Sequence, residues 1–154
     1  MIDYVRLEFD ATTKGNLFQF CLEQRLGLAD VGDQSPLTTD HFKFHVTIMY
    51  SKVTNSAFEE GIRDFKPHIL QPDAFDMFGP EKDHLVLRLH PDTVLTELHD
   101  YYRLTYGHVS DFSPFLPHLT IRGSDAKAKN RIDTLPLPNF ELRAERLIHQ
   151  IKIG

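Results

Sequence analysis

Two short segments with the same alternating pattern constrain the fold of this chain more than any other feature. The segments His45–Ile48 (HVTI) and His118–Ile121 (HLTI) alternate polar and apolar residues, which is the period-two pattern of a strand with one buried face. On such a strand the histidine and the threonine share one face, and the two apolar residues share the other. The sequence therefore predicts two strands anchored in a core, each presenting one imidazole and one hydroxyl.

The rest of the sequence predicts helices and strands in both halves of the chain. Strands are expected at Tyr4–Phe9, Lys43–Ser51, Ala74–Phe78, His84–His90 and Pro117–Arg122, with a turn at Gly79–Asp83. Phe140–Ile153 is expected to form a closing strand or a pair of strands. A first helix is expected to about Leu26, with Asp10 or Thr12 as its cap and Gly27 as its stop. Another is expected over Pro91–Tyr106, with Asp92 or Thr93 as its cap. Two shorter helices are expected over Ser56–Phe65 and Ser124–Leu135. Residues Ala29–Thr39 are expected to form a loop. This order favours one α+β domain of two lobes over residues 1–154, rather than a doubly wound parallel sheet.

Composition limits the class of partner. The formal net charge is −5, which argues against a protein that binds long nucleic acid through a basic face but allows a small anionic ligand in a local basic pocket. No segment approaches the ~20 apolar residues that a membrane span needs, and the N-terminus lacks the pattern of a signal peptide. The single Cys21 is expected to be a small buried hydrophobe. These features predict a cytoplasmic protein without a membrane segment.

Paired histidines and threonines on two strands suit phosphodiester cleavage without a metal. One neutral imidazole, from His45 or His118, can take a proton from the attacking oxygen, while the other, as imidazolium, gives a proton to the leaving oxygen. The hydroxyls of Thr47 and Thr120 can donate to the non-bridging phosphoryl oxygens. Either histidine can be the base, since that role depends on how the substrate is oriented.

The neighbours of the two motifs separate this chemistry from a metal site. The same-face rule places Lys43 beside the first histidine and Arg122 beside the second, which gives each motif a cation. A zinc site would need further ligands at usable spacing, but the sequence has no HExxH motif and no cysteine pair, so neither a metal nor another cofactor is expected. The other histidines are expected mostly on the solvated surface, at His41, His68, His84, His90, His99 and His108. His149, in the closing strand, is expected to be structural or to support the site.

The motif pair resembles the two-histidine (2H) phosphoesterase superfamily. The resemblance covers most of the chain, including FHVTIMYS, the hairpin AFDMFGPEKDHLVLRL, the segment PHLTI and the final strand FELRAERL. It implies a bilobal, LigT-like fold of two small antiparallel sheets with helices outside and a central groove that receives one motif from each lobe. It also implies that His45, Thr47, His118 and Thr120 are the catalytic and phosphate-binding residues.

Within this superfamily the chain looks closest to the phage anti-CBASS phosphodiesterases, because it is compact and its first motif continues into Met49–Lys52. Those enzymes cleave cyclic oligonucleotide second messengers such as cyclic GMP-AMP, here in the cytoplasm of an infected host. The resemblance implies a ribose 2′-hydroxyl as the nucleophile and an acidic residue in the C-terminal strand, for which Glu145 is the best match and Glu141 the next. Candidates for stacking against a base are Tyr4, Phe78, Phe112 and Phe115.

Two alternative functions stay open at this point. The first is an RNA 2′,3′-cyclic phosphodiesterase, which would turn over cyclic-ended RNA or 2′,3′-cyclic mononucleotides and act little on internal 3′–5′ bonds. The second is a nucleotide-binding module that keeps the fold and only sequesters its ligand. Intact copies of both motifs favour an enzyme over a binder.

Overall fold

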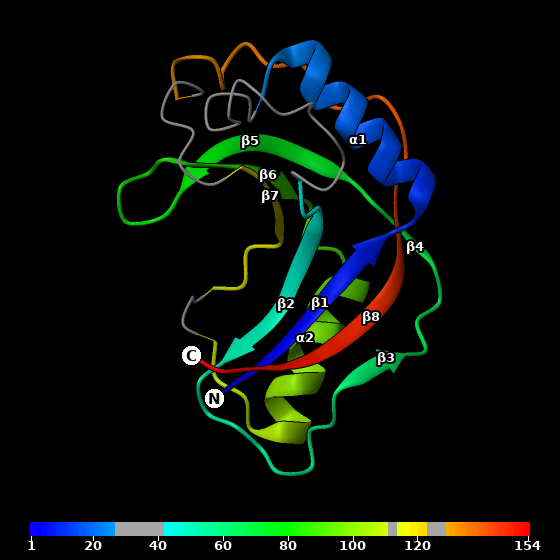
Figure 1. The fold of residues 1–154 in the computed structure, drawn as a ribbon, viewed down its shortest axis with the longest axis vertical. Helices are drawn as coiled ribbons and strands as arrows, with labels where there is room; N and C mark the ends of the chain where they lie inside the picture. Colours follow the sequence, from blue (N-terminus) through cyan, green and yellow to red (C-terminus); the bar gives the residue numbers. More distant parts are fainter. Residues whose placement is uncertain (27–41, 111–113, 123–128) are drawn as a thin grey trace.

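A computed structural model of the chain describes residues 1–26, 42–110, 114–122 and 129–154 (Figure 1). Its elements, in chain order, are β1 (Ile2–Phe9), α1 (Ala11–Gln24), β2 (His45–Ser51), β3 (Gly61–Arg63), β4 (His68–Leu70), β5 (Pro72–Phe78), β6 (His84–Leu89), α2 (Thr93–Tyr106), β7 (His118–Arg122) and β8 (Leu142–Lys152). The strands form one antiparallel sheet in the order β3-β8-β1-β2-β7-β6-β5, and β4 pairs with another part of β8. The predicted α+β class is confirmed.

The two histidine strands are neighbours in the middle of this sheet. β2 and β7 pair through Val46 opposite Leu119, the one registered pair between these strands in the described part of the chain. The pairing of β1 with β2 and of β6 with β7 is more extensive. The expectation of two separate small sheets is corrected here, because the backbones at the centres of the two motifs pair and join both halves into a single sheet.

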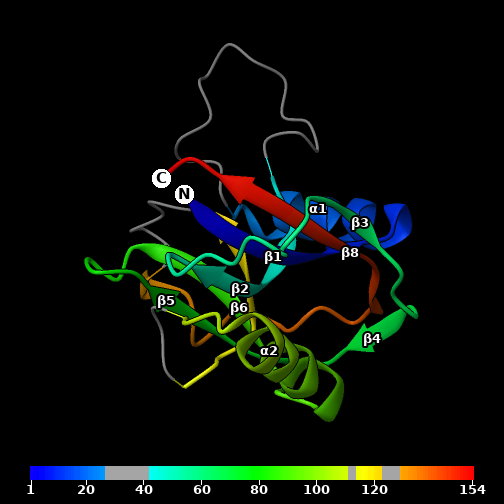
Figure 2. The same cartoon turned by 90° about the horizontal axis from the view of Figure 1, so that it is seen from below.

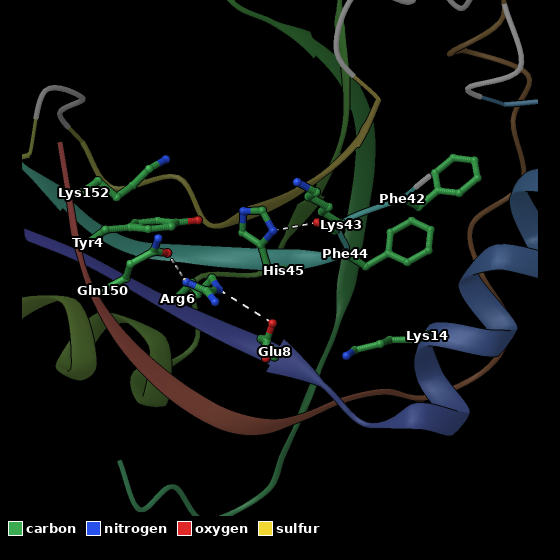
Figure 3. Close-up of a pocket in the computed structure, with 10 residues that line it drawn as sticks. All are labelled: Tyr4, Arg6, Glu8, Lys14, Phe42, Lys43, Phe44, His45, Gln150 and Lys152. Carbon is green, nitrogen blue, oxygen red and sulfur yellow. Dashed lines mark hydrogen bonds and ion pairs between the residues drawn. The ribbon is translucent and has the colours of Figure 1, made fainter. Parts of the chain in front are cut away.

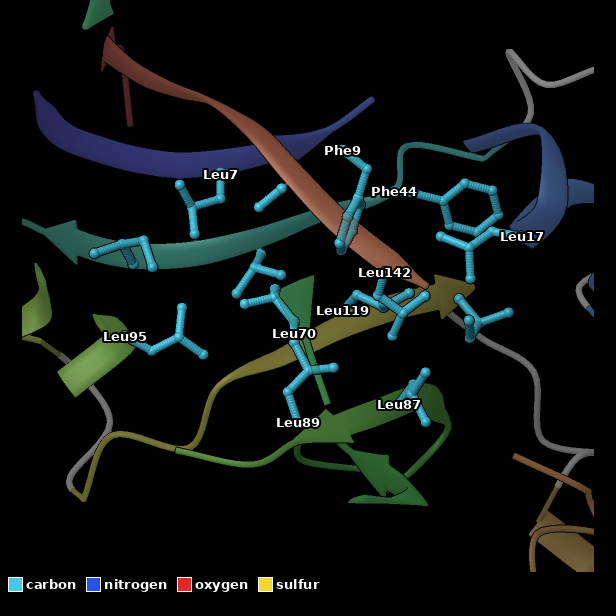
Figure 4. Packing of buried hydrophobic residues seen from close by; sticks show 14 of the residues in the cluster. Leu7, Phe9, Leu17, Phe44, Leu70, Leu87, Leu89, Leu95, Leu119 and Leu142 are labelled. Atoms are coloured by element: carbon cyan, nitrogen blue, oxygen red, sulfur yellow. The ribbon is translucent and has the colours of Figure 1, made fainter. Parts of the chain in front are cut away.

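The core holds both motif strands from behind. Val46 and Leu119 are fully buried, and the same hydrophobic cluster includes side chains from every strand of the sheet except β3 (Figure 4). The helix α2 lies behind β1 and β2 and contributes Leu95 and Tyr102, whereas α1 contributes Leu17 (Figures 1 and 2). Each buried aliphatic side chain contributes about 1.5–3 kcal/mol of transfer free energy. The strand faces that carry the histidines are therefore backed by a packed layer.

At both helices the cap is the aspartate of the two candidates that the sequence offered. Asp10 and Asp92 each accept a hydrogen bond from the backbone N–H three residues further on. The helix α2 ends at Gly107, whose φ of 67° lies in the left-handed region where glycine has no Cβ penalty. The helix α1 ends at Arg25, which is also left-handed. Gly27, the expected stop, lies outside the described residues.

Two other helix predictions are not met. Ser56–Phe65 forms a turn and then β3, because β8 is long enough to pair with this segment and Gly61 has a φ of +141°, far from helical values. Of the helix expected over Ser124–Leu135, only residues 129–135 are described; residues 129 and 130 are in a 3₁₀ turn and residues 131–134 form a turn, so no α-helix is present in this part. The loop expected at Ala29–Thr39 lies outside the described residues.

Two further features concern the single cysteine and the length of the helices. Cys21 is fully buried in α1, as predicted, and burial raises the pKa of its thiol to about 12, so the thiol stays protonated at neutral pH. Among the described residues, no helix is both long enough and apolar enough to cross a membrane.

Candidate active site

The pairing of β2 with β7 brings both motifs to one face of the sheet. Because the middle residues of the motifs are opposite each other, His45 lies across from Thr120, and Thr47 lies across from His118. The two histidines occupy one diagonal of this arrangement, where side chains on neighbouring strands are roughly 7 Å apart. They interact electrostatically, since a charge on His118 lowers the pKa of His45. The four motif side chains thus form the corners of one small patch.

Each imidazole is held by an equivalent backbone contact. His45 Nδ1 lies 2.6 Å from the carbonyl oxygen of Lys43, and His118 Nδ1 lies 2.8 Å from that of Leu116, in each case two residues earlier in the chain. A carbonyl oxygen only accepts, so Nδ1 carries the proton in both rings. Nε2 is therefore the ring atom that can accept or donate a proton toward a ligand.

Burial sets the protonation of both histidines. Burial removes water from His45 and so lowers its pKa, and this is the largest influence. The hydrogen bond to the Lys43 carbonyl oxygen raises the pKa in part. The positive charge of Arg6 lowers it further, and the negative charge of Glu8 raises it. Burial also lowers the pKa of His118, opposed by the Leu116 carbonyl. Without a ligand, both rings are neutral at pH 7.

A pocket of about 780 Å³ opens beside His45 (Figure 3). It is lined by Tyr4, Arg6, Glu8, Lys14, Phe42, Lys43, Phe44, His45, Gln150 and Lys152. Four of these side chains are cationic and one is a carboxylate, although the whole chain has a net charge of −5. A local excess of cations in an acidic protein favours an anionic ligand.

Arg6 is fixed next to the first motif by two contacts. It lies opposite Thr47 in the pairing of β1 with β2, and Glu8 lies opposite His45. The Arg6 guanidinium donates to Gln150 Oε1 at 2.7 Å and lies 3.7 Å from the Glu8 carboxylate (Figure 3). A guanidinium held in this way is preorganised beside the hydroxyl that we expect to bind phosphate.

Tyr4 lines the pocket, but in a different manner from the one expected. Only 7% of the residue is exposed, which leaves no free ring face for a base. The Lys152 ammonium lies 5.1 Å from its ring centroid, and its hydroxyl is 3.4 Å from Thr47 Oγ1. Tyr4 therefore supports the threonine and does not provide a stacking surface.

The other aromatic candidates are divided between the site and the core. Phe78 contacts His118 edge-on, with ring centroids 4.8 Å apart. Phe115 stacks on His99 at 4.2 Å and so packs against α2. Phe112 lies outside the described residues, as does the side chain of Arg122, of which only the backbone in β7 is described.

Neither candidate for the acidic residue of the C-terminal strand is among the residues that line the pocket. Glu145 is exposed at the point where the register between β1 and β8 shifts, and Glu141 is exposed just before β8 begins. The carboxylate in the pocket lining is Glu8, from β1.

Sequence reasoning missed most of the cationic pocket. The pocket residues it did not single out are Arg6, Glu8, Lys14, Phe42, Phe44, Gln150 and Lys152. The alternation within Tyr4–Phe9 contained a signal for two of them, since a buried face at Val5, Leu7 and Phe9 leaves the residues between them on the other face.

The histidine network beneath α2 is separate from this site. His108 was expected at the surface, but it is 1% exposed because its Nε2 pairs with the buried Asp3 carboxylate at 2.8 Å. His149 is a structural histidine, as expected: its Nε2 is 2.5 Å from the Tyr102 hydroxyl and its Nδ1 is 3.0 Å from the Glu59 carbonyl oxygen. In the described part of the chain, no group of three or more histidine, cysteine or carboxylate side chains is placed to hold a metal ion.

Fold and site together define the class of protein: an α+β protein with two paired histidine motifs and a cation-lined pocket beside the first of them. The chain belongs to the family of the anti-CBASS protein Acb1, whose model matches residues 3–145 and so includes both motifs. This family has an anti-CBASS role, and it implies a cyclic oligonucleotide as the ligand. No curated protein matches the sequence.

Proposed function

We propose that the chain is a metal-independent phosphodiesterase of the 2H class, a single bilobal domain with a LigT-like fold. In this proposal it cleaves 3′–5′ phosphodiester bonds in cyclic di- or oligonucleotide second messengers in the host cytoplasm, and so protects a phage from CBASS immunity. The observation that supports it most strongly is the diagonal placement of two histidines whose Nδ1 atoms are both fixed by carbonyl oxygens. Family membership supports the choice of ligand.

The proposed reaction is an in-line displacement at phosphorus. The basic histidine takes the proton from a ribose 2′-hydroxyl, whose oxygen forms a new bond to phosphorus as the bond from phosphorus to the 5′-oxygen breaks. The other histidine gives its Nε2 proton to that leaving 5′-oxygen. The products are a 2′,3′-cyclic phosphate and a free 5′-hydroxyl, so protons and electron pairs balance.

The corners of the motif patch assign the remaining roles. Thr47 and Thr120 lie on the second diagonal, where their hydroxyls can donate to the two non-bridging oxygens of a phosphate centred in the patch. Arg6 supplies positive charge next to Thr47. A bound phosphate anion also favours the protonated form of the nearer imidazole, which converts two neutral histidines into an acid and base pair.

The test is incubation of the purified protein with cyclic GMP-AMP in excess EDTA, with products separated by chromatography and analysed by mass spectrometry. We expect a linear product that ends in a 2′,3′-cyclic phosphate, which has the mass of the substrate but a different retention time, and a loss of about 100-fold or more in rate for His45→Ala and for His118→Ala. His90→Ala is the matched control, because His90 is exposed and is not among the residues that line the pocket.

Three outcomes would count against the proposal. An unchanged substrate pool would contradict it. Turnover of 2′,3′-cyclic mononucleotides alone would favour the RNA-end phosphodiesterase. Tight binding of cyclic GMP-AMP that survives His118→Ala, with no turnover by the unsubstituted protein, would favour the binding module.

A further inference from the structure

Gln150, near the end of β8, makes a close contact with the Arg6 side chain. Arg6 Nη1 donates to Gln150 Oε1 at 2.7 Å (Figure 3). The contact runs diagonally between neighbouring strands, because β1 and β8 pair with Gln150 opposite Tyr4, two residues before Arg6. A guanidinium only donates hydrogen bonds, so the oxygen of the Gln150 amide faces it. Gln150 therefore reaches Arg6 on the face of the sheet that carries the pocket.

Two other contacts hold Arg6, but neither is a direct hydrogen bond to a carboxylate. Arg6 Nε lies 3.7 Å from the Glu8 carboxylate, which is longer than the roughly 2.7–3.2 Å of an N–H···O hydrogen bond. The central carbon of the guanidinium lies 5.6 Å from the ring centroid of Tyr4, a cation–π contact. Of the three contacts the closest is thus the one to a neutral amide.

Part of the Arg6 side chain stays open to a ligand. It is 22% exposed and lines the pocket together with His45 and Gln150. A guanidinium has five N–H donors, and the hydrogen bond to Gln150 uses one of them. Arg6 also lies opposite Thr47 in the pairing of β1 with β2. A guanidinium that is fixed by a neutral group can offer its charge and its other donors to an anion next to that threonine.

The absence of charge on the Gln150 amide decides what the contact does. Gln150→Glu keeps the length and shape of the side chain and makes the hydrogen bond to Arg6 charge-assisted, which strengthens it by about twofold. The same change neutralises the guanidinium and places a negative charge where a phosphate would bind. Fixing Arg6 requires only an acceptor, whereas fixing it with its charge intact requires a neutral acceptor.

We propose that Gln150 is a positioning residue, which fixes Arg6 beside Thr47 through a neutral hydrogen bond and leaves the guanidinium charge to the phosphate of the substrate. The inference rests on the proposed function for the identity of that phosphate. It deepens that function by adding a residue of β8 that acts through Arg6 and does not contact the reacting atoms. The role differs from that of the acidic residue expected in the C-terminal strand, because it requires an uncharged side chain.

The experiment compares three side chains of similar length at this position. The unsubstituted amide accepts without charge, Gln150→Glu accepts with a negative charge, and Gln150→Met does not accept. Binding of inorganic phosphate at pH 7 and constant ionic strength is followed through the imidazole NMR signals of His45. We expect phosphate binding to weaken about tenfold in Gln150→Glu and about threefold in Gln150→Met. The value of kcat/KM for cyclic GMP-AMP should fall in the same order.

Two controls show whether the effect passes through Arg6. Gln71→Glu adds the same charge at an exposed position outside the pocket lining, and it should change neither phosphate binding nor kcat/KM. In Arg6→Gln protein, Gln150→Met should weaken phosphate binding by less than about twofold, because no guanidinium is left to position. Thermal unfolding establishes that each variant is folded, and Gln150→Ala replaces Gln150→Met if the latter is unstable.

Three results would overturn the positioning role. Phosphate binding by Gln150→Glu that equals or exceeds that of the unsubstituted protein would show that the contact only ties β1 to β8. An undiminished effect of Gln150→Met in Arg6→Gln protein would show that Gln150 does not act through the guanidinium. Unsubstituted protein in which phosphate leaves the His45 signals unchanged would show that Arg6 presents no charge to an anion at this site.

Turnover of cyclic GMP-AMP in EDTA separates this inference from the proposed function. Turnover with the same kcat/KM for Gln150→Glu and the unsubstituted protein would leave the function standing and overturn the positioning role. The expected order of phosphate affinities without any turnover would support the positioning role and overturn the phosphodiesterase.

Discussion

At the scale of single residues, the protonation of His45 and His118 decides what the site can do. Both side chains lie on a strand that is backed by core, and burial lowers the pKa of both. Their Nδ1 contacts with carbonyl oxygens define which nitrogen faces a ligand. Both properties come from strand position, since the bonding carbonyl is two residues earlier in each case.

The lowered pKa values have a consequence for stability. A histidine whose pKa is lower in the folded state binds fewer protons there than in the unfolded chain. Its contribution to the free energy of unfolding is therefore fully present above the unfolded pKa of about 6.5. That contribution is lost as pH falls below this value. We expect the free energy of unfolding, measured with urea, to decrease as pH falls from about 6.5. The double variant with His45→Gln and His118→Gln should show a flatter decrease.

Some of the pH dependence should persist in that variant, because burial also lowers the pKa of His149. His90→Gln is the control, since His90 is exposed. The double variant and the unsubstituted protein are compared by the slope of the free energy of unfolding against pH. An identical slope, or a slope of opposite sign, would show that the two motif histidines are not held neutral by the fold.

Tyr4 gives a second prediction at this scale. Removing its hydroxyl in Tyr4→Phe takes away the group 3.4 Å from Thr47 Oγ1 while keeping the ring that packs against Lys152. We expect kcat to fall by about threefold to tenfold, with little change in the free energy of unfolding, as for one lost hydrogen bond of about 1 kcal/mol. Tyr50→Phe, on the neighbouring ring, should leave kcat unchanged; equal losses for both variants would contradict a specific role.

At the scale of elements, the single registered pair between β2 and β7 positions the whole patch. Val46 and Leu119 are at the centres of the two motifs, and both are fully buried. A shift of this pair moves His118 and Thr120 on β7 relative to His45 and Thr47 on β2. The chemistry therefore depends on a contact that touches no ligand.

Leu119→Ala tests this dependence. Truncating a fully buried leucine is expected to cost about 2–5 kcal/mol of stability, and the cavity should allow β7 to move relative to β2. We expect kcat to fall about 100-fold at a temperature where the variant stays folded, since small misplacements of catalytic groups have large effects. Leu17→Ala, in α1, should lose similar stability but retain kcat; parallel losses of kcat in both would contradict the positioning role.

How far the sequence predicts these elements depends on whether local signals decide them. The sequence narrowed each helix cap to two candidates, Asp10 or Thr12 and Asp92 or Thr93, because a cap needs only its own side chain and the next three residues; the structure has the aspartate in both cases. The segment Ser56–Phe65 was misjudged because the long strand β8, nearly ninety positions later, turns part of it into a strand. Likewise, the joining of the two halves of the sheet at Val46 and Leu119 depends on tertiary pairing that no local pattern contains.

At the scale of the whole molecule, charge is distributed unevenly. The chain carries a net charge of −5, yet the pocket lining gathers Arg6, Lys14, Lys43 and Lys152 around one carboxylate. Sequence position did not reveal this gathering, because these cations are spread from residue 6 to residue 152 and meet only when β2 and β8 pair with β1. The motif residues, in contrast, were found because each motif is continuous in the sequence.

This distribution predicts a strong effect of salt on substrate binding. We expect KM for a cyclic dinucleotide to rise roughly tenfold between about 0.05 and 0.5 M sodium chloride, because screening weakens the attraction between the pocket and the phosphates. The free energy of unfolding should change little over the same range. A KM that does not respond to salt would indicate that the cations of the pocket do not contact the ligand.

The central claim, that His45 and His118 act as an acid and base pair, is tested most directly with a cyclic dinucleotide in which sulfur replaces the leaving 5′-oxygen. A thiolate leaves without needing a proton, so loss of the acidic histidine no longer matters, whereas loss of the basic histidine still does. In EDTA, we predict that one of the variants His45→Ala and His118→Ala recovers most of its activity on the sulfur substrate and that the other does not. Equal defects of both variants on this substrate, or cleavage by both at the unsubstituted rate, would contradict the paired mechanism.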